Sequence, residues 1–400
     1  MSLLVFNAGS GSLKFAAFEP TPGGRRCAVR GSLAPLDERG VMHLRHDGGE
    51  YHTQIGYAGP AQSVRYLIER ITPLLPGGRP PRAVAHRVVY GSGDSAGVAR
   101  VDAALLDRLR RSSMLAPLHE QLEIDIIEAA AAALGWQIPV FAAFDGSFFD
   151  KLPPVAANYA VAEPLRRRLG LRRKGFHGFA HASMLDGYGA MRGTREGQRV
   201  ISFQLGGGCS AAATVDGRPV DTSMGFTPLE GLVMATRCGD LDAGAVFQAL
   251  RSGIEPQRLQ RILEAESGLL GVSGLSGDMN VVLDAAHQGH AAAALARDLY
   301  CTRARKYLGA YLATLGGADA VLFGGGVGEH LAEVRSAICS GMRWAGIELD
   351  EDANRQLAGQ ARCISKPDSR TAVYVIPVDE EAAIDRAVHA ATTPNNGKHR

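Results

Sequence analysis

The sequence predicts a mixed α/β protein of two domains, and three observations support that prediction. The chain has 400 residues, which is long for a single hydrophobic core. Apolar runs with the length of strands alternate with helical patterns, an order typical of sheets covered by helices. A unit of strand, glycine turn and strand occurs near the N-terminus and again about halfway along the chain, which indicates an internal duplication.

In the first half of the chain, strands and helices are expected in alternation. The apolar runs 3–6 and 13–18 flank the turn NAGSGS, and apolar runs bounded by turn residues are typical of strands. Further strands are predicted at 83–89 and 140–144. Helical spacing of apolar residues predicts helices at 61–75, 103–112 and 118–134.

The second half repeats the strand and glycine-turn pattern and then becomes mainly helical. Strands are predicted at 200–205, 211–215, 219–221, 320–323 and 373–377, and helices at 165–169, 243–252, 291–315, 331–341 and 380–391. The turn GGGCS follows the first of these strands, and the cluster GGGVGE separates the fourth strand from a helix. Strand, glycine turn and helix in succession offer free backbone N–H groups to a phosphate or nucleotide.

Composition and charge exclude several classes of protein. With 46% hydrophobic and 21% charged residues, the chain does not have the composition of a disordered protein. Its formal net charge of +2 argues against nucleic acid or an anionic membrane as the main partner. The six cysteines lack metal-ligand spacing and no N-terminal signal segment is visible, so we expect reduced thiols in a cytoplasmic protein.

Four clusters of polar residues supply groups that a phosphoryl-transfer site needs. The first is the N-terminal turn, where residues two apart share a face, so that Ser10, Ser12 and Lys14 line one side. Asn7 lies in the same turn, and a solvated turn is the alternative interpretation. The second is Arg87, inside an apolar strand, where a buried guanidinium needs an anion; a structural salt bridge is the alternative.

The third cluster places titratable residues at the ends of expected elements. His119, Asp145 and His177 each adjoin apolar residues. Asp145 directly follows a strand, which is where sites gather in α/β folds. A histidine in such a place is more often a structural residue, and that alternative stays open for both histidines.

The fourth cluster is Arg237, in a glycine-containing loop that follows the segment 227–231. The neighbouring glycine indicates a loop that presents the guanidinium, and a surface salt bridge is the alternative. Near the C-terminus, Glu380 and Glu381 begin a helix, where carboxylates often only complement the helix dipole.

These clusters lie in motifs that together span nearly the whole chain. They read VFNAGSGSLKF, AHRVVYGSG, APLHE, FDGSF, GFHGFAH, QLGGGCS, DTSMGFTPLEGLVMATRCGDLDAG, SGLLGVSGLSGDM, LFGGGVGEH, CSGMRWAGIELD and IPVDEEAAI. With these motifs the chain resembles the acetate kinase family of acetate and propionate kinases, from about residue 3 to 390. The segment 221–244 is long and specific enough to carry the resemblance alone.

The resemblance implies a fold and a domain division. The fold is the duplicated ribonuclease H-like fold of sugar kinases, Hsp70 and actin, in which two α/β domains, each with a mixed five-stranded sheet, close on a nucleotide in a central cleft. Residues 1–148 and 382–400 would form an N-terminal domain on the carboxylate side. Residues 149–381 would form the nucleotide-binding C-terminal domain.

The resemblance also implies an activity, cofactors and an assembly. The family transfers a phosphoryl group reversibly from ATP to acetate, which yields acetyl phosphate and ADP, with Mg²⁺ or Mn²⁺ and usually as a homodimer. Propionate as the acceptor, and pyrophosphate or another nucleotide as the donor, remain open. A catalytically silent nucleotide-binding sensor is the alternative from another class.

Matched motif by motif, the resemblance assigns roles to individual residues. Asn7 and Glu380 would be linked to the metal, with Glu381 as the alternative to Glu380. The residues expected to act on the substrates are Arg87, Asp145, His177, Arg237 and His119. A pocket for the methyl or ethyl group would be formed by Val89, Leu118, Phe176 and Pro228. Phosphates and nucleotide would be bound by Ser10, Ser12, Lys14, Gly206, Gly207, Gly208, Gly324, Gly325, Gly326, Gly328 and Glu329.

Several positions depart from the family pattern, mostly on the side of the phosphoryl donor. The second glycine turn usually reads His-Leu-Gly-Asn-Gly, whereas this chain has Gln204 for the histidine and Gly207 for the asparagine that touches the nucleotide phosphates. His330 replaces an asparagine of the adenosine loop, Phe179 replaces a threonine, and Tyr90 replaces a histidine. The donor is therefore the part of the assignment that most needs a test.

Overall fold

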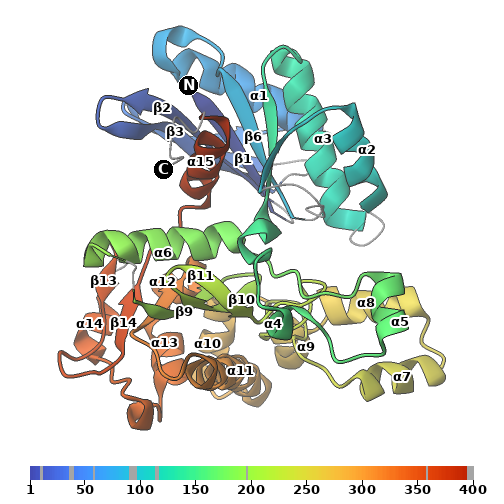
Figure 1. Ribbon diagram of the computed structural model, residues 1–400, viewed down its shortest axis with the longest axis vertical. Coiled ribbons are helices and arrows are strands. Elements are labelled where there is room, and N and C mark those ends of the chain that lie inside the picture. Colours follow the sequence, from blue (N-terminus) through green and yellow to red (C-terminus); the bar gives the residue numbers. More distant parts are fainter. Residues whose placement is uncertain are drawn as a thin grey trace, which may run out of the picture. The chain divides into compact units, whose positions relative to one another are not determined.

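The computed structural model describes residues 1–9, 12–35, 40–56, 59–89, 97–112, 117–194, 197–356 and 359–393. The chain divides into two compact units, Met1–Ser147 with Asp379–Arg400 and Phe148–Val378. From the sequence we expect the second junction after residue 381, whereas here Asp379, Glu380 and Glu381 belong to the first unit. Each unit has its own sheet (Figure 1).

The sheet of the first unit has the strand order β5-β4-β3-β2-β1-β6-β8-β7. Its strands are β1 (Leu3–Ala8), β2 (Leu13–Thr21), β3 (Gly24–Ala34), β4 (Gly40–His46), β5 (Gly49–Ile55), β6 (Ala83–Val88), β7 (Val98–Arg100) and β8 (Val140–Phe144). The strands β1, β6 and β8 are parallel, and the other pairs are antiparallel. All six residues of β1 are buried, as expected for a central strand covered on both faces.

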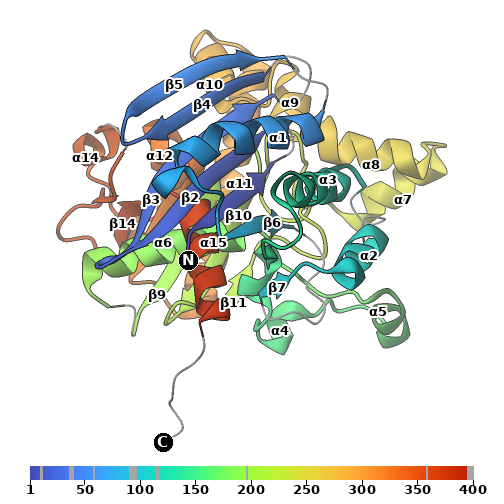
Figure 2. The same ribbon diagram turned by 90° about the horizontal axis from the view of Figure 1, so that it is seen from above.

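The described residues of this unit form the α-helices α1 (Pro60–Ile71), α2 (Ala103–Ser112), α3 (Pro117–Leu134) and α15 (Glu380–Thr392). α1 is shorter than the expected helix 61–75, because Pro73 cannot continue an α-helix and the chain turns into a 3₁₀ turn at Thr72–Leu74. α1 and α3 share a core with the sheet, which includes Phe6, Leu67 and Ile126. α15 packs on β1 and β2, and β4 and β5 extend one edge of the sheet (Figure 2).

The sheet of the second unit has the order β11-β10-β9-β12-β14-β13, in which β9, β12 and β14 are parallel. Its strands are β9 (Arg199–Leu205), β10 (Cys209–Val215), β11 (Arg218–Thr222), β12 (Ala320–Gly324), β13 (Arg362–Cys363) and β14 (Ala372–Val375). α6 (Gly178–Arg192) covers one face of the sheet, and α10 (Met279–His287), α11 (Ala291–Leu315) and α13 (Ala332–Cys339) lie on the other side (Figure 1).

The remaining helices of this unit are short and connect the larger elements. They are α4 (Pro154–Ala157), α5 (Glu163–Leu169), α7 (Ala243–Arg251), α8 (Pro256–Ala265), α9 (Gly268–Ser273), α12 (Gly325–His330) and α14 (Glu351–Arg355). The single helix expected at 331–341 is thus preceded by α12, so the glycine cluster itself is helical and the strand β12 leads directly into it. No helix among the described residues is both long and apolar enough to cross a membrane.

The two sheets share one strand order, which confirms the duplication indicated by the sequence. The order β3-β2-β1-β6-β8 in the first unit corresponds to β11-β10-β9-β12-β14 in the second, each with a hairpin followed by two parallel strands. The expected five strands are therefore the common core, but the described sheets are larger, with eight and six strands. Of the extra strands, β5 was not predicted because it is almost entirely exposed and has no apolar face.

Candidate active site

Three expected site residues of the first unit lie where parallel strands end. Asn7 is near the end of β1, Arg87 is near the end of β6, and Asp145 directly follows β8. Neighbouring parallel strands end at one edge of a sheet, which is where ligands bind in α/β folds. There the Arg87 Nη2 donates to Asp145 Oδ2 at 2.9 Å, and Nη1 donates to Asn7 Oδ1 at 3.5 Å.

The pair of Arg87 and Asp145 is buried, with side-chain exposures of 10% and 0%. Burial by itself disfavours the Arg87 cation, but the carboxylates of Asp145 and Glu380 outweigh burial and raise the pKa of Arg87. Arg87 Nε has no hydrogen-bond partner within the described part of the chain. The guanidinium is therefore permanently charged, fixed by its neighbours, and still has a donor for an anionic ligand.

Two carboxylates from the start of α15 complete this cluster. Asn7 Nδ2 donates to Glu380 Oε2 and to Glu381 Oε1, both at 2.7 Å. Burial and the nearby charge of Glu380 raise the pKa of Glu381, although the Asn7 hydrogen bond acts in the opposite direction. Since these carboxylates repel each other, a cation bound beside them would be favoured.

The donor set of this cluster fits Mg²⁺. The described residues hold no group of three or more His, Cys, Asp or Glu side chains suited to a metal. Mg²⁺, however, is usually bound by one or two carboxylates together with water and substrate phosphates. The two carboxylates of Glu380 and Glu381, held side by side by Asn7 Nδ2, match that requirement, so the residues present are compatible with the expected metal.

The first hairpin places a lysine across from Asn7. Lys14 and Asn7 are direct partners in the β1–β2 ladder, and such cross-strand pairs point their side chains to one face. The Gly9 N–H donates to the Ser12 carbonyl at 2.8 Å and closes the turn. Ser10 lies outside the described residues, so its expected role stays a prediction.

The expected apolar pocket is described only in part. Val89 follows β6, and its N–H donates to Glu123 Oε2 at 3.2 Å, so a buried glutamate of α3 fixes the backbone next to Arg87. Leu118 and His119 lie in the first turn of α3, and their side chains are outside the described residues. Phe176 is buried and Pro228 is half-buried in the second unit, so the pocket as a whole stays a prediction.

In the second unit, His177, Gly208 and Arg237 lie next to one another. His177 is the residue before α6 and has a left-handed backbone, with φ of 58°, a conformation that is costly for a non-glycine residue. A Cβ atom on Gly208 would lie 3.1 Å from His177 Nε2 and 3.7 Å from Arg237 Nη1. Glycine at 208 therefore lets both side chains approach the turn between β9 and β10.

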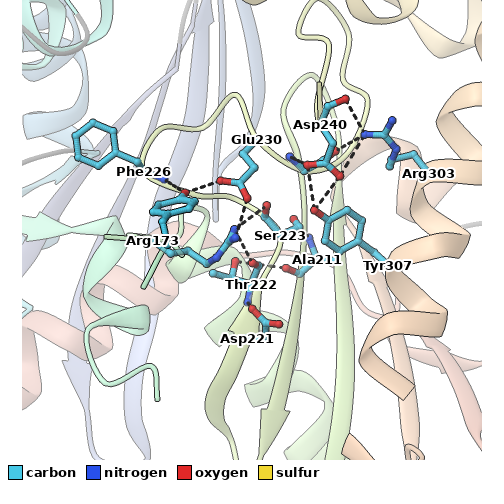
Figure 3. A network of polar contacts seen from close by, with 12 residues as sticks. Arg173, Ala211, Asp221, Thr222, Ser223, Phe226, Glu230, Asp240, Arg303 and Tyr307 are labelled. Atoms are coloured by element: carbon cyan, nitrogen blue, oxygen red, sulfur yellow. Dashed lines mark hydrogen bonds and ion pairs between the residues drawn. The ribbon is translucent and has the colours of Figure 1, made fainter. Parts of the chain in front are cut away.

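Arg237 is carried by a loop whose two ends are held by polar contacts (Figure 3). At one end Glu230 accepts hydrogen bonds from Tyr159 Oη and from Arg173 Nη2, the latter at 2.7 Å. Arg173 Nη1 also donates to the carbonyls of Thr222 and Ser223, at the end of β11. These contacts fix the start of the loop against the sheet.

The other end of the loop is closed by Asp240. Asp240 Oδ1 accepts from the Gly231 N–H at 2.8 Å, and the Asp240 N–H donates to the Gly231 carbonyl at 3.0 Å. Tyr307 and Arg303, both on α11, bind the Asp240 carboxylate (Figure 3). The segment between Gly231 and Asp240 is thus a closed loop anchored to a long helix.

Contacts between this closed loop and its neighbours orient Arg237 toward the glycine turn between β9 and β10. Arg237 Nη1 donates to the Pro228 carbonyl at 3.2 Å. The Ala235 N–H donates to the Gly207 carbonyl at 3.1 Å, which joins the loop to the turn between β9 and β10. The loop, the turn and His177 therefore form one connected structure.

The glycine turn after β9 and the glycine-rich helix α12 after β12 again lie at the carboxyl ends of parallel strands. The side chain of Gln204, on β9, reaches the start of α12, because a Cβ atom on Gly325 would be 2.7 Å from Gln204 Nε2. Glu329 Oε1 accepts from the N–H groups of Gly325 and Val378, both at 3.0 Å. Glu329 therefore fixes the start of α12 itself, in addition to any contact with a nucleotide.

Sequence reasoning missed several residues that support the site. They are Glu123, Tyr159, Arg173, Ser202, His181, Ser210, Asp240, Arg303 and Tyr307. Most act through partners far away in the sequence, so no local pattern reveals them. His181 is the exception, since its spacing of four from His177 within the motif GFHGFAH is that of one helix face.

Comparison with known proteins identifies the family. The Acetokinase family model matches residues 2–386. The chain is 38% identical to the acetate kinase of Solibacter usitatus, over 96% of this chain and 97% of that protein. The structure matches the acetate kinase of Porphyromonas gingivalis with a TM-score of 0.85, at 30% identity and over 98% of this chain and 100% of that one.

A second solved structure broadens the comparison to another substrate. The propionate kinase of Francisella tularensis matches with a TM-score of 0.86, at 28% identity and over 96% of this chain and 97% of that one. These matches cover nearly the whole of both units, and the matched family is the one that the sequence motifs resemble. The chain belongs to the Acetokinase family.

Proposed function

We propose that the protein is an acetate kinase that transfers a phosphoryl group reversibly from ATP to acetate and forms acetyl phosphate and ADP. The observation that carries the proposal is the hydrogen-bonded cluster of Asn7, Arg87, Asp145 and Glu380 at the carboxyl edge of the first sheet. A structural ion pair alone would not require the further carboxylates and the amide around Arg87.

The charges of the candidate residues suit this reaction. A loose phosphoryl transition state spreads negative charge over three oxygens. We assign to Arg87, Arg237 and His177 the role of stabilising that charge. Asp145 holds Arg87 in place. The acceptor carboxylate is itself the nucleophile and is already ionised near neutral pH, so the reaction needs no general base.

The metal in this proposal is Mg²⁺, and Mn²⁺ would serve in the same way. Asn7, Glu380 and Glu381 are the residues that would hold it, directly or through water. When bound, the ion supplies positive charge that offsets the charge of the donor phosphates. Asn7 keeps both carboxylates close together by donating to each of them.

The donor in this proposal is ATP, despite the departures at Gln204 and Gly207. The N–H groups of a glycine turn or of the first turn of a helix can bind phosphate oxygens without any side chain, and both glycine segments follow parallel strands. Gly206, Gly207 and Gly208 would bind one part of the nucleotide, and Gly324, Gly325, Gly326 and Gly328 the other. Lys14 and Ser12 would serve the phosphates from the first hairpin.

We also propose a homodimer in the cytoplasm, where ATP is available. Large apolar side chains are exposed on the second unit, and a partner subunit would bury them. They are Leu241, Phe247 and Leu250, in and next to α7, and Leu295 and Leu299 on α11. Sedimentation of the purified protein tests this part independently of activity.

A matrix of donors and acceptors tests the proposal. ATP, GTP and pyrophosphate are each paired with acetate, propionate and butyrate, and acyl phosphate is trapped with hydroxylamine. We expect ATP with acetate to give the highest kcat/KM. Propionate is the second candidate acceptor, because the Francisella tularensis structure is that of a propionate kinase and one methylene changes discrimination by only about 1–3 kcal/mol. Transfer from pyrophosphate alone would refute ATP as the donor. If no combination of donor and acceptor gave acyl phosphate, the result would support a silent sensor.

A further inference from the structure

A buried chain of hydroxyl groups and imidazole rings leads from His177 into the core of the second unit. His177 Nδ1 lies 2.9 Å from Ser210 Oγ, which in turn lies 2.8 Å from His181 Nε2. His181 Nδ1 lies 2.8 Å from Ser202 Oγ. His181, Ser202 and Ser210 have no exposed surface, so the chain is sealed from solvent at its inner end.

The protons along this chain are not independent of one another. A serine hydroxyl has one proton to donate, and a neutral imidazole has one N–H and one acceptor nitrogen. Ser210 faces two ring nitrogens, so it donates to one ring and accepts from the other. When Ser210 donates to His177 Nδ1, it accepts from His181 Nε2–H, and Ser202 donates to His181 Nδ1. In this direction the proton of neutral His177 is on Nε2.

The surroundings of His177 Nε2 decide which direction suits the reaction. This nitrogen lies beside Gly208, and Arg237 Nη1 lies near the same glycine; these are the two residues that we assign to phosphate and phosphoryl binding. An Nε2–H group donates to an anionic phosphoryl oxygen, whereas a bare Nε2 lone pair repels it. In the opposite direction of the chain, neutral His177 would present that lone pair.

We propose that Ser210, supported by His181 and Ser202, holds neutral His177 in the Nε2–H tautomer for phosphoryl transfer. The inference rests on the proposed function, because it takes the anion at Nε2 from that proposal. Ser210, His181 and Ser202 are positioning residues that act through His177. The chain also ties the ring of a residue with a left-handed backbone to two buried strand positions, on β9 and β10, which keeps its orientation fixed.

Enzyme kinetics on serine variants provide the first test. Ser210→Ala removes the donor to Nδ1, and we expect kcat to fall about tenfold while the KM values for acetate and ATP stay within about twofold. Ser210→Thr retains the hydroxyl and should recover most of the loss. Ser202→Ala removes the far end of the chain without touching His177 and should lower kcat in the same direction. Ser63→Ala, at a buried serine of α1 with one hydrogen bond to a carbonyl, is the matched control and should leave kcat unchanged.

A double-mutant cycle separates this role from a general effect on folding. If Ser210 acts through His177, the variant H177A/S210A is no slower than H177A, because the two effects are not additive. Thermal unfolding of each variant shows whether it is folded. A wild-type kcat in both S210A and S202A, or fully additive effects in the cycle, would overturn the inference.

The ring nitrogens of His177 can also be observed directly. In protein labelled with ¹⁵N-histidine, long-range ¹H–¹⁵N spectra distinguish the two tautomers and the cation, and the signal of His177 is identified by its loss in H177A. We expect the Nε2–H tautomer in the wild type and a mixture in S210A. The Nδ1–H tautomer or the cation in the wild type at neutral pH would overturn the inference. This result can be read without any turnover, so a failure of the proposed function is recognised separately, by absent phosphoryl transfer in the wild type.

Discussion

At the scale of single residues, the ion pair of Arg87 and Asp145 belongs to the candidate site, and breaking it should also destabilise the fold. Removing one member of a buried pair leaves the other charge unpaired, which typically costs about 3–5 kcal/mol. We therefore expect Asp145→Ala to lower the free energy of unfolding by about that amount, and Asp145→Asn by less, since the amide keeps a hydrogen-bond acceptor for Arg87. Urea denaturation measures both values.

The matched control for this prediction is an exposed pair in the same unit. Asp107 binds Arg110 on α2, with both side chains about half exposed. Exposed pairs contribute at most about 1 kcal/mol, so Asp107→Ala should change the free energy of unfolding only slightly. Equal effects of the two alanine substitutions would contradict the account of the buried pair.

The burial of His86, the neighbour of Arg87, should make the free energy of unfolding depend on pH. Burial lowers the pKa of His86 from 6.5 to about 3, and its Nε2 has no partner among the described residues. At a pH between these two pKa values, His86 binds a proton in the unfolded chain but not in the native state, so the free energy of unfolding falls as the pH falls. We expect His86 to lower the free energy of unfolding by about 1.4 kcal/mol for each pH unit below pH 6.5. The substitution His86→Leu should remove this pH dependence.

The measurement for His86 is urea denaturation of wild type and H86L at several pH values between 6.5 and 3. Because all other groups titrate alike in both proteins, the difference between the two curves isolates His86. Curves that stay parallel over this range would show that the imidazole is charged in the native state.

At the scale of elements, the closed loop that carries Arg237 is held by Asp240, which binds Gly231 within the loop and Tyr307 on α11 (Figure 3). Asp240→Ala removes both contacts. A displacement of about 1 Å in a positioned group can cost about 10²-fold in rate, so we expect kcat/KM for acetate phosphorylation to fall by tenfold to a hundredfold. Asp298→Ala on α11, where the carboxylate is exposed and binds Arg297, is the control and should leave kcat/KM unchanged. Equal activities of D240A and wild type would mean that the loop does not depend on this anchor.

The turn between β9 and β10 tests the departure from the family at position 207. A Cβ atom on Gly207 meets nothing within 4 Å, so an asparagine fits without repacking. We expect Gly207→Asn to lower the KM for ATP by about tenfold, because its amide adds a hydrogen bond to a charged phosphate. Gly207→Ala, which adds bulk without an amide, should leave this KM unchanged. A KM for ATP that is the same in wild type, G207N and G207A would mean that the side chain at 207 does not reach the phosphates.

The elements also show what the sequence could predict and why the rest escaped it. The long helix α11 (Ala291–Leu315) has the predicted bounds, although its apolar residues do not gather on one face. The strand β8 (Val140–Phe144) has the predicted bounds because a continuous apolar run determines it locally. The same holds for Asn7, Arg87 and Asp145, which stand at the ends of apolar strands. Ser210 and Arg173 escaped prediction because their partners are set by which strands and loops meet in three dimensions.

At the scale of the whole molecule, the duplicated units have diverged in the chemistry of corresponding positions. In the first unit the strands β1, β6 and β8 end in an amide, a guanidinium and a carboxylate, which form a charged cluster. In the second unit β9 ends in a glycine turn and β12 leads into the glycine-rich helix α12, and the charged group is supplied by the loop with Arg237. We interpret the first unit as the acceptor and metal side, and the second unit as the nucleotide side.

The central claim is that this chain transfers a phosphoryl group to a short carboxylate with the residues named above. The most direct measurement is hydroxylamine-trapped acyl phosphate formed from ATP, Mg²⁺ and acetate by the wild type, by Arg237→Ala and by Arg237→Lys. We expect efficient formation by the wild type and a loss of about 10²–10³ in kcat for R237A, with R237K partly active. Unchanged acyl phosphate formation by R237A, in a wild type that is active, would contradict the assignment of the site.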